Sequence, residues 1–553
     1  MSGEPPMKSQ CLPFTQIPHT TRLFLDYLSY APAVRGMYPR SPVFSEWVKE
    51  EAQGVVYDEG RRSKVSEILE RQNRGWGASG KALANIDRLR RGAVAAVTGQ
   101  QVGLFGGPLF SIFKALTAVK LAEQATAAGV DCVPVFWLAT EDHDLAEVSQ
   151  AALLSGEGLL QPFSVEGRAL ESEAATDAPV GTVRFGAEID SAVERAAALL
   201  GDSEVADWLR QAYRQGETFG SAFALLFARL FAEWGVILLD PADKEFHELA
   251  KPLFREAIKR ASELDEGLLA RGKAIEAAGY HQQVKVTSET TLLFEVKNGA
   301  RTVVRRKNSG VRDSGDEFVV GEERASREEL LERIDRTPEK FNPNVLLRPV
   351  VQDYLLPTLV YTGGAAEVAY FGQVGVVYEK LLGRVTPILP RFSATLLEPK
   401  PQRILTHYQL GLPDVLVGPE RIREVLASRS LPPDLQARFE EAYTSVERVM
   451  AALRESIGKL DSTLIDATEN TRASVSNQLD RLRAKVARAE QQRNEVITRK
   501  ADALSNALYP HKALQEREVA GVSFVARYGP GLLARLLEKI HPDCHDHQVI
   551  AVQ

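Results

Sequence analysis

Cysteine is scarce in this 553-residue chain, which contains only Cys11, Cys132 and Cys544. Three widely separated thiols cannot build a disulfide framework or a cysteine-rich zinc site. The chain has no apolar run near the roughly 18 residues that a membrane helix needs. Its polar start, MSGEPPMKSQ, lacks the apolar core of a secretory signal. These absences argue against a disulfide-rich secreted protein and a membrane protein, so we expect a cytoplasmic location.

An excess of positive charge is also missing. The net charge is −7 and the isoelectric point is near 5.9, which argues against a nucleic-acid partner or a polybasic membrane contact. Basic pockets remain available, because the chain contains 67 lysines and arginines. Its length predicts more than one folding unit.

Strands followed by helices dominate the first four hundred residues. Apolar β-type runs occur at 94–98, 133–140, 235–239 and 356–362, separated by runs with helical period. This alternation predicts an α/β fold with a Rossmann-like, doubly wound parallel sheet.

Two insertions and a helical arm interrupt this pattern. Residues 150–215 are rich in alanine and glutamate and are expected to be mostly helix or loop. Three short β-type runs lie between 284 and 307, and Asn298-Gly299 between the last two predicts an antiparallel hairpin. From 434 to 508 there is no proline, and apolar residues step by three and four, interrupted by a polar stretch at 466–471. Two long antiparallel helices, or one longer coiled-coil arm, fit that pattern.

We therefore expect three regions. They are a Rossmann-like core over 1–400 with insertions at about 150–215 and 280–340, a helical coiled-coil domain over 401–508, and a C-terminal segment, 509–553, that returns to the core.

The glycine-dense turn at 99–107 follows the first predicted strand and leads into a helix with Pro108 near its start. Free N–H groups at a helix start attract anions, so Gly106 and Gly107 are candidates for phosphate contacts. Gln100 and Gln101 are candidates for orienting a polar substrate. The turn matches neither G-x-G-x-x-G nor the phosphate-loop motif, so a purely structural turn is the alternative.

A second candidate is the acidic cluster Glu141-Asp-His-Asp144, which ends the next predicted strand. Carboxylates beside an imidazole can raise its pKa and make it a general acid or base, or they can bind a cation. We predict catalytic roles for His143, Asp142 and Asp144 and a substrate contact for Glu141. A solvated turn is the alternative.

Further candidates lie between residues 344 and 393. A second glycine turn opens a helix, and an arginine before it can pair with a carboxylate or phosphate. A packing turn and a structural salt bridge are the alternatives. The predicted substrate or nucleotide contacts here are Asn344, Arg348, Gly363, Gly364, Glu367, Arg391 and Ser393.

The segment His541-Pro-Asp-Cys-His-Asp-His547 suggests a metal site by composition. Its spacing matches no standard zinc pattern, so we predict no metal.

Several of these motifs occur together in one known family. They are Thr98-Gly-Gln-Gln, Thr140-Glu-Asp-His-Asp, Gly279-Tyr-His, Asn344 to Asp353, Tyr361 to Phe371, Pro390-Arg-x-Ser393, Gln515-Glu-Arg517 and His547-Gln-Val-Ile550. Over essentially its whole length, the chain resembles the cysteine-adding enzymes of bacillithiol biosynthesis.

The resemblance implies a ligase that adds cysteine to the amino group of glucosaminyl malate. It also implies a core similar to class I aminoacyl-tRNA synthetases, a nucleotide pocket and a homodimer formed through the coiled coil. Activation of a carboxylate suggests ATP. The HIGH and KMSKS signatures are missing, and Gly106-Gly-Pro-Leu stands where HIGH would be. The synthetases' catalytic residues are therefore not carried over. An adenylyltransferase and a coiled-coil interaction protein with a nucleotide-binding core are the alternatives.

Overall fold

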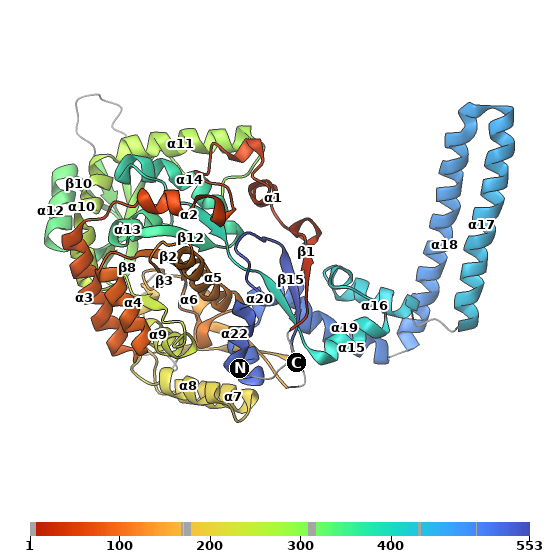
Figure 1. Ribbon diagram of the computed structural model, residues 1–553, viewed down its shortest axis with the longest axis horizontal. Coiled ribbons are helices and arrows are strands. Elements are labelled where there is room, and N and C mark those ends of the chain that lie inside the picture. The colour runs from red at the N-terminus through yellow and green to blue at the C-terminus, as the bar shows by residue number, and fades with distance from the viewer. Residues whose placement is uncertain are drawn as a thin grey trace. The chain divides into compact units, whose positions relative to one another are not determined.

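The computed structural model describes residues 7–156, 158–167, 170, 178–307, 317–429, 433–493 and 495–553. The chain forms two compact units. The first contains Met1–Thr395 and Glu516–Ile550, and the second contains Leu396–Gln515 and Ala551–Gln553 (Figure 1). In the described part of the chain, no helix is long and apolar enough to cross a membrane.

The centre of the first unit is a five-stranded parallel sheet, which confirms the predicted Rossmann-like α/β fold. Its strands lie in the order β13-β12-β2-β3-β6. In chain order they are β2 (Val94–Gln100), β3 (Cys132–Leu138), β6 (Ile237–Leu239), β12 (Thr358–Gly363) and β13 (Ile388–Pro390). In chain order, β3 and β6 are added on one side of β2, and β12 and β13 are then added on its other side. The strand order therefore reverses between β2 and β12, which is where open α/β sheets bind ligands.

Both faces of this sheet are buried. Successive side chains of a strand point to opposite faces, and those of β2 divide between two core clusters. Ala95 and Val97 pack with Phe254 of α10 (Lys244–Lys259) and Val374 of α14 (Ala365–Leu382). Ala96 on the other face packs with residues of α2 (Phe44–Gln53) and α5 (Leu109–Ala127). This explains why the strands are continuous apolar runs rather than alternating ones.

Further helices complete the first unit. They are α1 (Arg22–Leu28), α3 (Glu59–Gly75), α4 (Gly80–Arg90), α6 (Leu145–Val148), α11 (Ala261–Ala277), α13 (Arg348–Leu355), α20 (Gln515–Glu518), α21 (Val522–Tyr528) and α22 (Gly531–Leu537).

α9 (Phe219–Leu230) follows the first insertion and leads into β6. The first insertion contains α7 (Ile189–Leu200) and α8 (Glu204–Ala212). It also contains an antiparallel pair that was not predicted, β4 (Gln150–Leu154) and β5 (Leu160–Ser164). The β4 sequence Gln-Ala-Ala-Leu-Leu favours a helix locally, but strand pairing overrides that preference.

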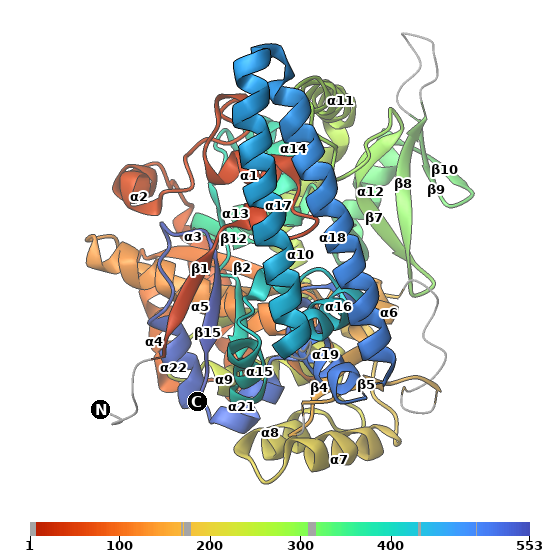
Figure 2. The ribbon, with the colours of Figure 1, turned by 90° about the vertical axis from the view of Figure 1, so that its right-hand side faces the viewer.

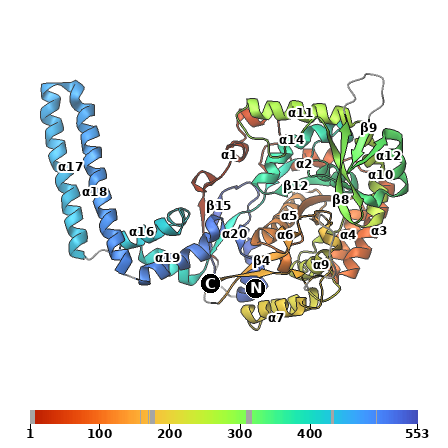
Figure 3. The ribbon, with the colours of Figure 1, turned by 180° about the vertical axis from the view of Figure 1, so that it is seen from behind.

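The second insertion is a five-stranded sheet in the order β10-β9-β8-β7-β11. The predicted hairpin is confirmed, because β7 (Thr290–Lys297) and β8 (Ala300–Lys307) flank Asn298 and Gly299, which have φ of 51° and 82°. The β-type run expected near 284 is not a strand. The sheet is completed by β9 (Glu317–Val320), β10 (Glu323–Ser326) and β11 (Phe341–Pro343), and α12 (Arg327–Arg336) lies beside it (Figures 2 and 3).

The second unit is helical. α15 (Pro399–His407), α16 (Pro419–Arg429) and α19 (Glu495–Leu508) accompany a long antiparallel pair, α17 (Pro433–Leu460) and α18 (Ile465–Arg493) (Figures 1 and 2). The Tyr443 hydroxyl donates to Asp480 across this pair at 2.6 Å. The reversal lies at Asp461–Leu464, so the polar stretch at 466–471 begins α18 instead of breaking the arm.

Strands near the two ends of the chain pair within the first unit. β1 (Ser9–Leu12) pairs antiparallel with β15 (His547–Ala551), placing Cys11 opposite Gln548.

Candidate active site

A cavity of about 660 Å³ lies at the carboxyl edge of the parallel sheet. All five strands contribute to this edge, and the reversal between β2 and β12 lies within it. The lining residues are Gly99, Gln100, Gln101, Phe110, Lys114, Trp137, Ala139, Glu141, Asp142, His143, Glu147, Pro241, Phe294, Arg301, Pro343, Asn344, Val345, Arg348, Tyr361, Gly364, Ala365, Ala366, Glu367, Tyr370, Arg391 and Arg517.

Most of the candidate residues from the sequence line this cavity. Those that do are Gln100, Gln101, Glu141, Asp142, His143, Asn344, Arg348, Gly364, Glu367 and Arg391. Asp144, Gly106, Gly107, Gly363 and Ser393 are absent from the lining. Asp144 instead caps α6, where its carboxylate accepts the Glu147 N–H at 3.0 Å.

The two glycines expected to cradle phosphate have other partners. The Gly106 N–H donates to the Tyr213 hydroxyl at 3.0 Å, and the Gly107 N–H donates to the Leu104 carbonyl at 3.0 Å. Both glycines have positive φ, 83° and 70°, which L side chains rarely adopt. In this structure they form a buried turn outside the cavity lining, and their N–H groups donate to other groups of the protein.

A buried ion pair joins the two sides of the strand reversal. Lys114 of α5 lies 2.6 Å from Glu367 of α14, and the ammonium also donates to the Gly99 carbonyl at 2.7 Å. Burial lowers the pKa of Lys114, and the Glu367 carboxylate only partly offsets this. Burial acts to raise the pKa of Glu367, but Lys114 outweighs it and the pKa is lowered. The 2.6 Å separation of Nζ and the carboxylate oxygen, together with the lowered pKa of Glu367, supports a charged pair.

A second buried carboxylate holds Arg391 against the cavity. The Arg391 guanidinium donates to Glu516 at 2.7 Å and lies over the Phe110 ring, 5.2 Å from its centroid. Glu516 also accepts from the Ser393 hydroxyl at 2.9 Å, and that hydroxyl lies 2.8 Å from Nδ1 of His547. Burial lowers the pKa of His547 to about 4, so this imidazole is neutral. Ser393 therefore belongs to the network behind Arg391.

Two arginines of the lining contact uncharged side chains. Arg348 donates to Gln352 at 3.1 Å and to the Tyr370 hydroxyl at 3.2 Å. Arg517 lies near the Phe110 ring, 6.0 Å from its centroid. In the described part of the chain, neither guanidinium forms an ion pair with a carboxylate. The part of the cavity lined by Arg348 and Arg517 can therefore bind anionic groups of a ligand.

The carboxylate of Glu141, which follows β3, lines the cavity on the β2 side of the strand reversal. Oε1 of Glu141 lies 2.9 Å from Nε2 of His247 and accepts from Asn342 at 2.5 Å. Burial opposes protonation of His247, but its pKa is raised because Glu141 stabilises the imidazolium. No described residue forms a hydrogen bond to Oε2 of Glu141, so this oxygen is available to a ligand.

His143 is held by two neighbours. A guanidinium N–H of Arg301 lies 3.0 Å from Nδ1, and Asp142 accepts the backbone N–H of His143 at 2.7 Å. Since arginine only donates, Nδ1 of His143 accepts, and the neutral ring carries its proton on Nε2. The other oxygen of Asp142 accepts from Gln101 at 2.8 Å, which links the ends of β3 and β2.

Several lining residues were not identified from the sequence. Lys114 could have been found from the sequence, because it is the one charged residue in the mostly apolar stretch Ser111–Val119, which a core helix would bury. Arg517 lies in the Gln515-Glu-Arg517 motif, but nothing local linked it to this site. Arg301 comes from the hairpin of the second insertion, and only the tertiary fold brings it to His143.

We predict that Lys114→Met lowers the free energy of unfolding of the first unit by about 3–5 kcal/mol, because it leaves the Glu367 carboxylate buried without its cation. All five tryptophans lie in the first unit, so tryptophan fluorescence during urea unfolding measures this loss.

The matched control is Lys120→Met, which removes a partly exposed lysine from the same helix. The double variant Lys114→Met/Glu367→Gln should recover much of the loss. Equal losses in Lys114→Met and Lys120→Met would contradict a charged buried pair.

Comparison with known proteins identifies the family. Residues 7–392 match the family described as "Bacillithiol biosynthesis BshC, N-terminal Rossmann-like domain", and 394–552 match its C-terminal coiled-coil domain. A relative from Koribacter versatilis is 47% identical over 99% of this chain and 100% of its own. One from Solibacter usitatus is 36% identical over the same shares, and both carry the name "Putative cysteine ligase BshC". The resemblance found in the sequence is confirmed, and the chain belongs to the BshC family of bacillithiol biosynthesis.

Proposed function

We propose that this protein is a carbon–nitrogen ligase that joins cysteine to the amino group of glucosaminyl malate, the last step of bacillithiol synthesis. The observation that carries this proposal is the division of charge in the cavity. Among the described residues, Arg348 and Arg517 on one side form no ion pair with a carboxylate, and Oε2 of Glu141 on the other side accepts no hydrogen bond.

The arginine side suits the malate group. Malate carries two carboxylates, and guanidinium groups bind carboxylates with two parallel hydrogen bonds. Arg391 lies beside these residues, already oriented by Glu516. A cavity of about 660 Å³ also falls within the range of about 300–1,000 Å³ that is typical of small-molecule sites.

The Glu141 side suits the amine. At neutral pH the amino group of the sugar is an ammonium ion, and it must lose a proton before its nitrogen attacks a carbonyl carbon. His247 and Asn342 hold Oε1 of Glu141, so Oε2 can bind the ammonium and accept that proton. We therefore assign the general base to Glu141.

His143 then has a different role from the one that the sequence suggested. Its Nδ1 accepts from Arg301, so its Nε2 donates and cannot take the proton of the amine in this tautomer. We propose that Nε2–H of His143 hydrogen-bonds to oxygen at the reacting carboxyl group, with Arg301 orienting the ring through Nδ1.

ATP is the co-substrate that we propose for activating the carboxylate of cysteine, since a free carboxylate has no leaving group. With Arg348 and Arg517 assigned to the malate, the cationic side chains of the cavity left for phosphate oxygens are Lys114 and Arg391. It does not offer the backbone cradle expected at Gly106 and Gly107. An enzyme that only adenylates, without joining, is the alternative function. A free-thiol substrate and a nucleotide support a cytoplasmic location.

We predict that purified protein forms the cysteinyl conjugate from cysteine, glucosaminyl malate and ATP, as followed by mass spectrometry. Release of AMP would indicate adenylation, and release of ADP would indicate an acyl phosphate. Glu141→Gln should lower kcat by about 10²–10⁴-fold, the usual contribution of a general base, and His143→Ala should lower it less.

Glu248→Gln, an exposed substitution on α10 next to His247, is the control and should retain wild-type kcat. Wild-type turnover by Glu141→Gln would refute the assigned base. AMP formation without conjugate would favour the adenylating alternative.

We also propose that the α17–α18 arm forms a homodimer with a second copy of the chain. Apolar side chains are exposed along it, including Val449 (55% exposed) and Leu453 (45%) on α17 and Leu482 (51%) on α18. Val449, Leu453 and Leu460 follow spacings of four and seven, so they share one face of α17. A second copy carries the same stripe and can cover it.

Sedimentation of the wild type should give twice the chain mass of 60.9 kDa, because this stripe is buried between two copies. Leu453→Glu/Leu482→Glu should shift it toward the monomer. Glu455→Lys, two residues further on and therefore on the other side of α17, should leave the dimer intact. A monomeric wild type, or a double variant that remains dimeric, would refute the interface.

A further inference from the structure

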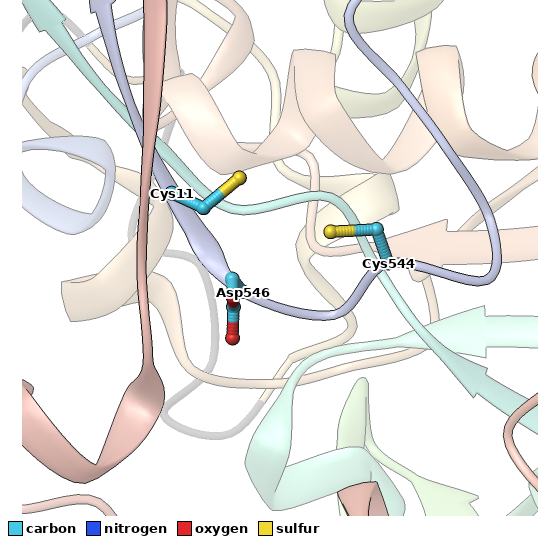
Figure 4. A group of neighbouring side chains, drawn as sticks. All are labelled: Cys11, Cys544 and Asp546. Atoms are coloured by element: carbon cyan, nitrogen blue, oxygen red, sulfur yellow. The ribbon is translucent and has the colours of Figure 1, made fainter.

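Three potential metal ligands from the two ends of the chain converge outside the candidate active site. They are Cys11 on β1 and Cys544 and Asp546 just before β15, and their ligand atoms all lie within 4.8 Å of one another. In Figure 4 the two sulfur atoms face each other across the gap between these segments. None of the three residues lines the cavity described above.

The fold holds this cluster in place from both sides. The β1–β15 ladder pairs Leu12 with His547 and Cys11 with Gln548. Asp543, which precedes Cys544, accepts from the Ser45 hydroxyl at 2.7 Å. Nε2 of His545 lies 2.6 Å from the Pro42 carbonyl. The segment is therefore anchored on each side of Cys544.

The ligand chemistry fits a borderline-soft divalent cation. Cysteine thiolates with a carboxylate favour zinc among the common cellular cations. Zn–S bonds of about 2.3 Å in a tetrahedral centre place two sulfurs about 3.8 Å apart, so the ligand atoms need to close by only about 1 Å. Both cysteines are exposed and can make that adjustment. No lysine or arginine in the described chain forms an ion pair with Asp546.

We propose that Cys11, Cys544 and Asp546 bind one Zn²⁺ ion, with water as the fourth ligand. The ion ties Cys11 of β1 to Cys544, which lies just before β15 and 533 positions further along the chain. None of the three histidines within residues 541–547, including His541, belongs to this cluster. His545 is bonded to Pro42, and His547 is buried beside Ser393 and Thr395.

Cobalt(II) is the probe for the test, because thiolate ligation gives it an intense charge-transfer absorption. The full-length protein, reduced and freed of metal with a chelator, should bind one Co²⁺ per chain, and Zn²⁺ should displace it. Cys11→Ser and Cys544→Ser should each abolish the charge-transfer band. Asp546→Asn should weaken Zn²⁺ binding by more than tenfold. Cys132→Ala, which removes the buried third cysteine, is the control and should bind normally.

Alkylation of the wild type provides a measurement that does not depend on folding of the variants. Bound Zn²⁺ should protect Cys11 and Cys544 from iodoacetamide, as read by peptide mass spectrometry. The proposal is overturned by absence of stoichiometric metal binding, by binding that survives both serine substitutions, or by alkylation unaffected by Zn²⁺. It is also overturned if the isolated protein holds these cysteines as a disulfide.

Discussion

The ion pair between Lys114 and Glu367 joins the helices that follow β2 and β12, and the candidate site lies at the ends of these two strands. Lys114 belongs to the helix after β2, and Glu367 belongs to the helix after β12, the two strands between which the sheet order reverses. Each partner also binds the strand end beside it, Lys114 through the Gly99 carbonyl and Glu367 through the Gly364 N–H. The ion pair thus links the carboxyl ends of the adjacent strands β2 and β12. Lys114, Glu367, Gly99 and Gly364 all line the cavity, so this link fixes one part of its wall.

The other charges of the cavity are arranged around this pair. Glu516 orients Arg391 from behind, and His247 with Asn342 orients Glu141. Both orienting sets are buried, so the groups that face the cavity are held by contacts that water does not screen. Arg348 and Arg517 form no ion pair with a carboxylate among the described residues, so their guanidinium groups can bind an anionic ligand on that side. A ligand with carboxylates at one end and an amine at the other would satisfy both sides at once.

Much of this arrangement could be predicted from the sequence, because the carboxyl ends of parallel strands meet at one edge. Gln101, Glu141 and Glu367 each follow a predicted strand, so this rule places all three at the same edge of the sheet. It could not place Arg301 or Arg517, which come from an insertion and from the C-terminal segment and reach the cavity only through tertiary packing. The glycines after β2 were misleading for a physical reason. Gly106 and Gly107 meet the need for positive φ in a buried turn, and a glycine-rich helix start that binds anions has the same appearance in sequence.

The central claim is that this cavity binds the amino-sugar malate as the acceptor of cysteine. An experimental structure of the full chain with glucosaminyl malate tests it most directly. The account predicts the malate carboxylates within hydrogen-bonding distance of Arg348 and Arg517, and the sugar amine at Oε2 of Glu141. Binding at any other place on the chain, or in the reverse orientation with the amine toward the arginines, would contradict it.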